Sequence, residues 1–232
     1  MKKYYEDEYI IIYNSDSLSI LDKLPEFNVM LTDPPYPNDK RFPCKWELIS
    51  EFASLSYDIA PDNTWFVSDF SKSYLCEWLK HFQPWQYVDI VAAHVSNSMA
   101  MCRFGFDIFI PSLIMAKGKP KVFKKWSNLI PAIRESNGVQ WGHPSPKYVS
   151  VYSRYIAMLL PEDGLLIDPF MGSGTSMVAC KLLNRKGIGI EINEEYCKIA
   201  VERLSQCVLP LFGTQETEVI ENTSTNTERL KC

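Results

Sequence analysis

Short apolar runs alternate with amphipathic segments along most of this chain, and this alternation constrains its fold most strongly. Runs rich in β-branched and aromatic residues predict strands at residues 9–13, 28–32, 64–68, 87–93, 106–115, 165–167 and 187–190. Helices are predicted between them, at residues 18–24, 46–59, 72–81, 148–160, 175–183 and 194–205. The pattern predicts a single α/β domain, a doubly wound and mostly parallel sheet with helices on both faces.

Composition sets the limits of this domain. The chain has 232 residues, of which 46% are hydrophobic, enough for one sizeable core. We predict a domain over residues 1–212 and a disordered polar tail over residues 213–232. No run of eighteen apolar residues occurs, so neither a membrane span nor a signal peptide is predicted. Seven cysteines without a C-x-x-C pair and three dispersed histidines predict free thiols in a reducing cytoplasm and no metal site.

The segment Asp33-Pro34-Pro35-Tyr36, which we call the Asp33 loop, directly follows a predicted buried strand. Each proline fixes φ near about −65° and lacks a backbone N–H, which leaves carbonyl groups free to accept hydrogen bonds. Asp33 adds a carboxylate and Tyr36 adds a flat ring. Acceptors beside an aromatic face suit the exocyclic amino group of a planar base, although a strand that ends in a Pro-Pro turn is the structural alternative.

A second loop, which we call the glycine loop, follows another predicted strand and opens a helix: Asp168-Pro169-Phe170-Met171-Gly172-Ser173-Gly174-Thr175. Its glycines allow close approach of a ligand, and the helix N-terminus offers unpaired N–H groups. Glu191 ends the next strand, 23 residues after Asp168, where a ribose diol is held in nucleotide-binding units. No third glycine of a G-x-G-x-x-G pattern follows, which disfavours a pyrophosphate cofactor.

These motifs, in this order, resemble those of the DNA amino-methyltransferases in which D-P-P-Y precedes D-P-F-x-G-S-G-T. The resemblance covers roughly residues 8–205. That family carries H-P-x-x-K-P before the glycine loop. Here His143-Pro144-Ser145-Pro146-Lys147-Tyr148 matches it except that Tyr148 replaces the last proline.

The resemblance implies S-adenosyl-L-methionine as cofactor and assigns roles by position. Asp16 would lie near the adenine, Glu191 at the ribose, Asp168 at the methionine amino group, and Lys147 with Ser145 at the carboxylate. The rest of the predicted cofactor site is Pro169, Phe170, Gly172, Ser173, Gly174 and Thr175. Helix capping by Asp16 and core packing by Phe170 are equally compatible with the sequence.

The implied reaction is methylation of an exocyclic amine in DNA, with Asp33, Pro34, Pro35 and Tyr36 as catalytic residues and the target base extruded from the duplex. In the family, aspartate at the first position favours adenine N6 over cytosine N4. The alternative substrates are cytosine N4, RNA and a protein amide. The alternative function is that of a non-catalytic nucleic-acid-binding partner. Cys44, which follows Pro43, resembles a covalent cytosine-methylating nucleophile only superficially.

The overall charge of −4 argues against a general nucleic-acid coat, but residues 117–147 hold seven basic side chains and one acidic one. We predict a short basic target-recognition loop at about residues 116–142, which binds duplex DNA through phosphates and stacking. Its predicted DNA-binding residues are Lys119, Lys121, Lys124, Lys125, Trp126 and Arg134. Base readout could come from Asn128, Arg134, Asn137 and Gln140. The alternative to a DNA-binding loop is a loop that is simply solvated. A homodimer or a partner subunit could contribute to target recognition. A second basic surface for DNA is offered by Lys40, Arg41 and Lys45.

Overall fold

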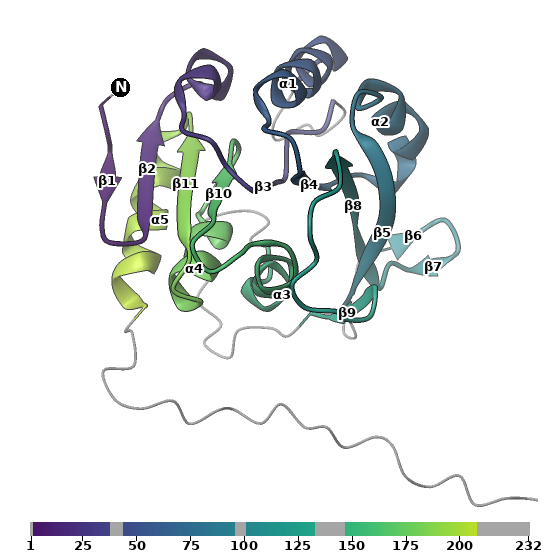
Figure 1. Ribbon diagram of the computed structural model, residues 1–232. Coiled ribbons are helices and arrows are strands. Elements are labelled where there is room, and N and C mark those ends of the chain that lie inside the picture. Colours follow the sequence, from purple (N-terminus) through teal and green to yellow (C-terminus); the bar gives the residue numbers. More distant parts are fainter. Residues whose placement is uncertain (1, 38–43, 96–100, 133–146, 208–232) are drawn as a thin grey trace, which may run out of the picture.

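The computed structural model describes residues 2–37, 44–95, 101–132 and 147–207. A nine-stranded sheet in the order β1-β2-β11-β10-β3-β4-β8-β5-β9 forms its centre, and β6 and β7 form a separate hairpin (Figure 1). The strands are β1 (Tyr5–Glu6), β2 (Ile10–Asn14), β3 (Val29–Thr32), β4 (Thr64–Asp69), β5 (Gln86–His94), β6 (Met101–Cys102), β7 (Gly105–Phe106), β8 (Phe109–Lys117), β9 (Leu129–Pro131), β10 (Leu165–Asp168) and β11 (Lys186–Glu191).

The α-helices are α1 (Trp46–Ile59), α2 (Leu75–His81), α3 (Val149–Leu159), α4 (Thr175–Leu182) and α5 (Glu194–Gln206). Helices α1 and α2 cover one face of the sheet, and α3, α4 and α5 cover the other (Figure 1). Strands β2, β11, β10, β3 and β4 run parallel, whereas β8 is antiparallel to both β4 and β5. The predicted fold class is confirmed.

Two predicted helices differ from the structure. Residues 18–24 form two 3₁₀ turns, Ser17–Ser19 and Leu21–Lys23, in place of one α-helix. Leu24 precedes Pro25, and a residue before proline is displaced from the α conformation, so a longer helix cannot form there. In the predicted helix at 72–81, the first turn, Lys72–Tyr74, is also 3₁₀.

Every residue of β3 is buried, as expected for a parallel strand covered on both faces. One apolar cluster packs between the sheet and α3, α4 and α5, and a second packs against α1 and α2. The second cluster is rich in aromatic residues, including Phe52, Phe66 and Trp78. Tyr36, in the segment that follows β3, packs against it, with its ring centroid 5.8 Å from that of Trp78.

The two edges of the sheet must be distinguished. We call the edge where the five parallel strands end the carboxyl edge, and the opposite one the amino edge. The pairing of Thr32 with Ser68 and of Asp168 with Gly189 brings the ends of β3, β4, β10 and β11 together at the carboxyl edge. Lys117, the last residue of β8, pairs with Thr64, the first residue of β4, and therefore lies at the amino edge.

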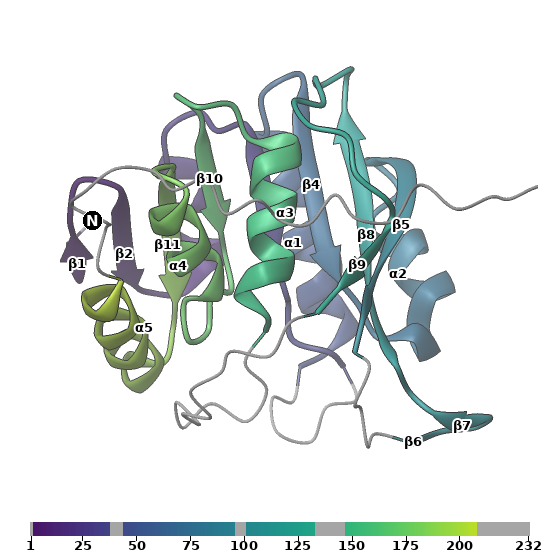
Figure 2. The same cartoon turned by 90° about the horizontal axis from the view of Figure 1, so that it is seen from below.

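The β6–β7 hairpin projects beyond the sheet from the ends of β5 and β8, on the side of the carboxyl edge (Figure 2). The backbone N–H of Val95 donates to the Ile108 carbonyl at 2.7 Å, and Lys72 forms an ion pair with Asp107 at the base of the hairpin. The predicted strand at 106–115 was wrong at its start, because residues 105–106 belong to this hairpin. Phe104, near the tip, is 95% exposed.

Candidate active site

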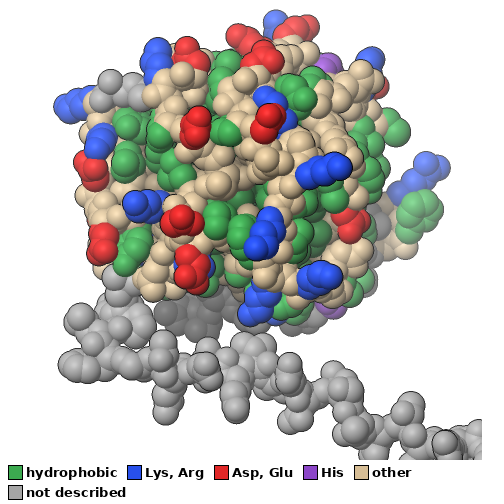
Figure 3. All heavy atoms as spheres, in the orientation of Figure 1, with side chains coloured by type: hydrophobic (Ala, Val, Ile, Leu, Met, Phe, Trp, Pro, Cys, Tyr) green, Lys and Arg blue, Asp and Glu red, His purple; other side chains and the backbone are tan. Residues whose placement is uncertain are grey.

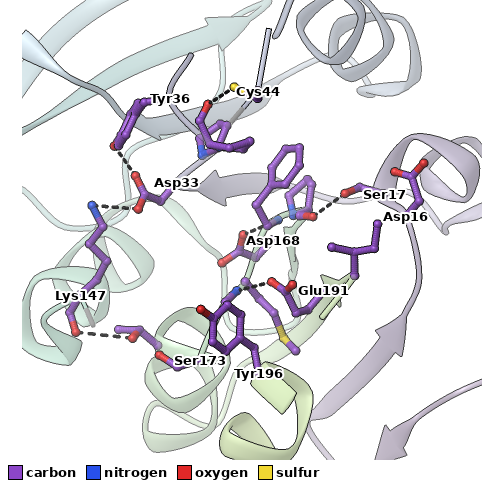
Figure 4. A pocket seen from close by; sticks show the side chains of 18 of the residues that line it. Asp16, Ser17, Asp33, Tyr36, Cys44, Lys147, Asp168, Ser173, Glu191 and Tyr196 are labelled. Atoms are coloured by element: carbon purple, nitrogen blue, oxygen red, sulfur yellow. Dashed lines mark hydrogen bonds and ion pairs between the residues drawn. The ribbon is translucent and has the colours of Figure 1, made fainter. Parts of the chain in front are cut away.

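A cavity of about 610 Å³ opens at the carboxyl edge and brings the two predicted loops together (Figure 4). This volume is within the range of small-molecule sites. Predicted site residues that line it are Asp16, Asp33, Pro34, Pro35, Tyr36, Lys147, Asp168, Pro169, Phe170, Gly172, Ser173, Thr175 and Glu191. Figure 4 shows Asp33 and Lys147 facing each other on one side, with Asp16 and Glu191 on the other and Asp168 between them.

The Asp33 loop offers its carboxylate to the cavity. The Tyr36 hydroxyl donates a hydrogen bond to one carboxylate oxygen of Asp33, and the Lys147 ammonium lies 2.9 Å from the other. The Cys44 thiol donates to the Pro35 carbonyl at 3.2 Å. Burial raises the pKa of that thiol, so it stays protonated and is a poor nucleophile, in agreement with chemistry that needs no covalent step.

Asp168 is held in a different way, because its carboxylate is buried among neutral donors. It accepts hydrogen bonds from the Thr32 hydroxyl at 2.8 Å, the Phe170 N–H at 3.1 Å and the Ser176 hydroxyl. Burial raises the pKa of Asp168 to about 7, although these hydrogen bonds lower it. Asp168 thereby connects β3, the glycine loop and α4, and it titrates near neutrality.

Glu191 fixes the turn of the glycine loop. Its two carboxylate oxygens accept hydrogen bonds from the backbone N–H groups of Gly172 at 3.0 Å and Asn193 at 2.8 Å. Burial raises the pKa of Glu191, and these backbone donors oppose the shift. Gly172 has a φ of +52°, a left-handed conformation that favours glycine. The carboxylate therefore stands at the cavity wall, at the end of β11, with acceptor positions for a diol.

Gly174 has a different reason to be glycine. It does not line the cavity, its φ is +77°, and an added Cβ would lie 2.7 Å from the Cβ of Ala200. The residue is needed for close packing of α4 on α5. Its predicted role in the cofactor site stays a prediction.

A family model described as DNA methylase, for N6 and N4 methyltransferases, matches residues 85–202, half of the chain. The chain belongs to this family. Among curated proteins, the Type II methyltransferase M.ScaI of Streptomyces caespitosus is 25% identical over 91% of this chain and 86% of its own length. M.HpaI of Haemophilus parainfluenzae is 50% identical over 62 residues, but this match spans only 20% of that protein.

Two solved structures resemble the methylase. The M1.HpyAVI–SAM complex superposes with a TM-score of 0.70 and 26% identity, and covers 84% of this chain and 98% of that one. The PvuII DNA methyltransferase, described as cytosine-N4-specific, has a TM-score of 0.76 over 87% of this chain and 88% of its own, at 19% identity. The second likeness shows the fold alone.

Asp16 and Phe170 both make structural contacts and both line the cavity. Asp16 caps the first 3₁₀ turn by accepting the Leu18 N–H at 3.1 Å, and it also lines the cavity. The Phe170 ring packs edge-on against Phe52, with centroids 5.0 Å apart, and it too lines the cavity. The structural roles are therefore observed at both positions, and the cofactor-binding roles stay predictions.

Sequence reasoning missed several residues of this site. Ile192, directly after Glu191, is 72% exposed and lines the cavity with Leu48 and Tyr196. The available signal in the sequence was a large apolar side chain directly after Glu191, the acid predicted to hold the ribose. Arg203 is buried and donates to the Ser173 carbonyl at 2.8 Å and the Thr175 hydroxyl at 3.1 Å, so it braces the glycine loop. The sequence signal for Arg203 was an arginine among the apolar positions of α5.

Lys147 has partners that the sequence did not indicate. Its ammonium lies 2.9 Å from Asp33 and 3.2 Å from Asp69, a buried acid at the end of β4 that we did not predict. Burial lowers the pKa of Lys147, but Asp33 and Asp69 outweigh it and raise the pKa above its ordinary value. The predicted contact of Lys147 with a cofactor carboxylate stays a prediction, as does that of Ser145, which lies outside the described residues.

The predicted DNA-binding lysines do not converge on the cavity. Lys119 donates its backbone N–H to the Asn63 side chain, and the Lys121 carbonyl accepts from the Trp65 indole, both at 2.9 Å and at the amino edge. Trp126 lies between Lys124 and Arg154, with the charged groups 4.7 and 5.0 Å from its ring centroid. This is the packing alternative for Trp126. The DNA-binding role of these residues and of Lys125 stays a prediction.

Several other predicted residues lie outside the described part of the chain: Arg134, Asn137, Gln140, His143, Lys40, Arg41 and the predicted tail at 213–232. On the face in Figure 3, Lys and Arg side chains are interspersed with acidic ones. Within the described ranges, no group of three or more potential ligands could hold a metal ion, and no helix is long and apolar enough to cross a membrane.

Proposed function

We propose that this methylase transfers the methyl group of S-adenosylmethionine to the N6 amine of adenine in duplex DNA, after the base is extruded into the cavity. One observation carries the proposal: the Asp33 loop and the glycine loop with Glu191 open onto the same cavity. The Asp33 loop offers acceptors for an amine. Glu191 offers acceptors for a diol, and the glycine loop lets the backbone approach a ligand closely.

S-Adenosylmethionine is the cofactor, as family membership and the M1.HpyAVI–SAM complex support. The residues of the cavity fit it. Glu191 would hold the ribose hydroxyls, Asp16 and Ile192 would border the adenine, and Asp168 would face the amino group. When bound, the cofactor supplies a methyl group on a sulfonium centre.

The chain's own residues would prepare the target nitrogen. Its lone pair is delocalised into the base, so the free amine is a weak nucleophile. Asp33 and the Pro34 carbonyl would each accept one N–H, which favours a pyramidal nitrogen with its lone pair directed at the methyl group. The new N–C bond forms as the donor's C–S bond breaks, and the nitrogen then loses one proton to water. Asp33 stabilises the positive charge that develops in between.

Adenine is preferred because aspartate stands at position 33, but cytosine N4 is the second candidate. The fold neighbour PvuII is described as cytosine-N4-specific, and both bases present an amine beside a ring. The deciding experiment supplies labelled cofactor with duplex DNA, RNA and protein, then identifies the methylated nucleoside. N6-methyladenine in DNA is expected. N4-methylcytosine would replace the adenine assignment, and label in RNA or protein alone would overturn the DNA assignment.

We further propose that DNA approaches the carboxyl edge. The β6–β7 hairpin projects there with Arg103 and Phe104 exposed, and Lys45 is exposed at the start of α1. Strand spacing places the stem of the hairpin about 10–14 Å across the sheet from β3, within one duplex width of the Asp33 loop. A second subunit and a cytoplasmic location stay predictions.

A further inference from the structure

Asp69 belongs to a buried polar network that the proposed function does not use. It is 2% exposed and ends β4. One carboxylate oxygen accepts from the Ser112 hydroxyl, and the other accepts from the Tyr152 hydroxyl at 3.0 Å and faces the Lys147 ammonium at 3.2 Å. The Tyr155 hydroxyl donates to Ser112 at 2.9 Å. Strands β4 and β8 and helix α3 thus hold this carboxylate in one orientation.

The sheet register places Asp69 beside Asp33. Because Thr32 pairs with Ser68 in adjacent parallel strands, the next residues of the two strands are neighbours at the carboxyl edge. Two carboxylates in such positions repel each other, and Lys147 lies between them. We call these three residues the acid–lysine cluster. Its formal charge is −1, with two anions and one cation.

The sign of this charge matters for the chemistry at Asp33. A target amine acquires positive charge as its new bond forms, so a nearby cation opposes the reaction. Lys147 is such a cation, 2.9 Å from the carboxylate that would serve the amine. Paired with Asp33 alone, it would leave a neutral site. Asp69 supplies the second negative charge and also offers Lys147 another partner when an amine takes its place at Asp33.

We propose that Asp69 is a positioning residue for methyl transfer: by pairing with Lys147, it keeps the acid–lysine cluster negative and Asp33 available to the target amine. This rests on the proposed function, because it requires an amine that becomes cationic at Asp33. Burial raises the pKa of Asp69, and Lys147 is the main influence that lowers it. The pairing with Lys147 therefore supports the charged form that the proposal needs.

A double-mutant cycle tests the charge of the cluster directly. Asp69→Asn makes the cluster neutral, and we expect kcat to fall on the order of 10²-fold while the Kd for cofactor and for DNA changes little. Lys147→Met leaves two adjacent carboxylates, so the pKa of one rises and the acid limb of the kcat–pH profile moves to higher pH. The double variant restores a charge of −1 and should recover roughly tenfold or more of the kcat lost in Asp69→Asn.

The pH profile must be read against all titratable neighbours. These are Asp33 and Tyr36 after β3, Asp69 on β4, Tyr152 and Tyr155 on α3, Lys147 before α3, and Asp168 after β10. Tyr152 and Tyr155 have pKa values raised by burial, so they stay neutral across the tested range. The limb that moves in Lys147→Met therefore reports on the carboxylates.

Asp7 and Lys181 provide a matched control, because they form a partly buried ion pair of 2.7 Å at the amino edge. Asp7→Asn and Lys181→Met should leave kcat unchanged, and thermal unfolding of all variants reports on folding. A wild-type level of kcat in Asp69→Asn, or a double variant less active than either single one, would overturn the inference about Asp69 but not the proposed function. A wild-type protein that methylates no DNA would overturn the proposed function and the inference together.

Discussion

The carboxyl and amino edges of the same sheet differ in what they hold, although both carry strongly charged loops. At the carboxyl edge, Asp33, Asp69, Asp168 and Glu191 follow or end four parallel strands. All of them except the buried Asp69 line one cavity. At the amino edge, the basic segment after β8 is occupied by structural contacts. Lys117, the last residue of β8, likewise donates to the Tyr57 and Ala60 carbonyls at 2.9 and 2.7 Å, at the C-terminal end of α1.

This difference teaches that charge alone does not locate a site. In a parallel sheet, ligands bind where strands end and loops diverge, which gives the carboxyl edge its acceptors and its space. The antiparallel strand β8 carries the lysine-rich segment to the other edge, about 15 Å away along the strand. Variants at the two edges test this division of function.

Asp33→Ala should reduce methyl transfer on the order of 10³-fold or more, because the amine loses its charged acceptor. Cofactor affinity should persist, since Asp33 serves the amine. Transfer of labelled methyl groups measures the first quantity and isothermal titration calorimetry the second. Asp7→Ala, at the amino edge, is the control. Loss of cofactor binding in Asp33→Ala would show that both loops serve the cofactor.

Asp168 predicts a pH dependence of stability. Its native pKa of about 7 exceeds the ordinary value of 3.8, so between about pH 4 and 7 the native state holds a proton that the unfolded state has released. The free energy of unfolding therefore falls as pH rises through this window and levels off above it, by at most about 4 kcal/mol.

The isosteric variant Asp168→Asn removes this contribution. Urea unfolding at pH 5, 6, 7 and 8 should give a shallower fall than in the wild type, with the remaining slope due to other buried acids such as Asp69 and Glu191. Parallel curves for the two proteins would mean that Asp168 is ionised throughout.

Sequence reasoning reached most of the carboxyl edge because its rules are local. A strand followed by Asp-Pro-Pro-Tyr or by a glycine loop fixes both the loop and its edge, so Asp33, Gly172 and Glu191 were found by position. Asp69 was not, because Ser68-Asp69 carries no turn or motif, and only the register with β3 and the burial of Lys147 reveal it. The basic segment was assigned by composition, which contains no information on the direction of β8.

Glu191→Gln should weaken cofactor binding about 10- to 100-fold, because charge-assisted hydrogen bonds to ribose hydroxyls contribute roughly 1.5–3 kcal/mol. The amide retains an acceptor for the Gly172 N–H, so the turn of the glycine loop should survive. Calorimetry with S-adenosylmethionine gives the dissociation constant, and Glu194→Gln, an exposed acid three residues later, is the control. Equal affinities in both variants would argue against the ribose role.

The smallest effect is expected from the lysines that composition singled out. Each phosphate contact contributes about 0.9 to the slope of log affinity against log salt on duplex DNA. If DNA meets the carboxyl edge, replacing Lys119, Lys121, Lys124 and Lys125 by Gln should change the slope by less than about 0.9 in total. Replacing only Lys45 and Arg103 should lower it by up to about 1.8. Cofactor affinity should be unchanged in both variants, which separates DNA contact from misfolding.

A slope that falls in the four-lysine variant and persists in the Lys45 and Arg103 variant would place the duplex along the amino edge. The target base would then have to cross the sheet to reach Asp33. That path is about 15 Å long and filled by the buried residues of β3 and β4, which is the physical reason for our proposal that DNA approaches the carboxyl edge.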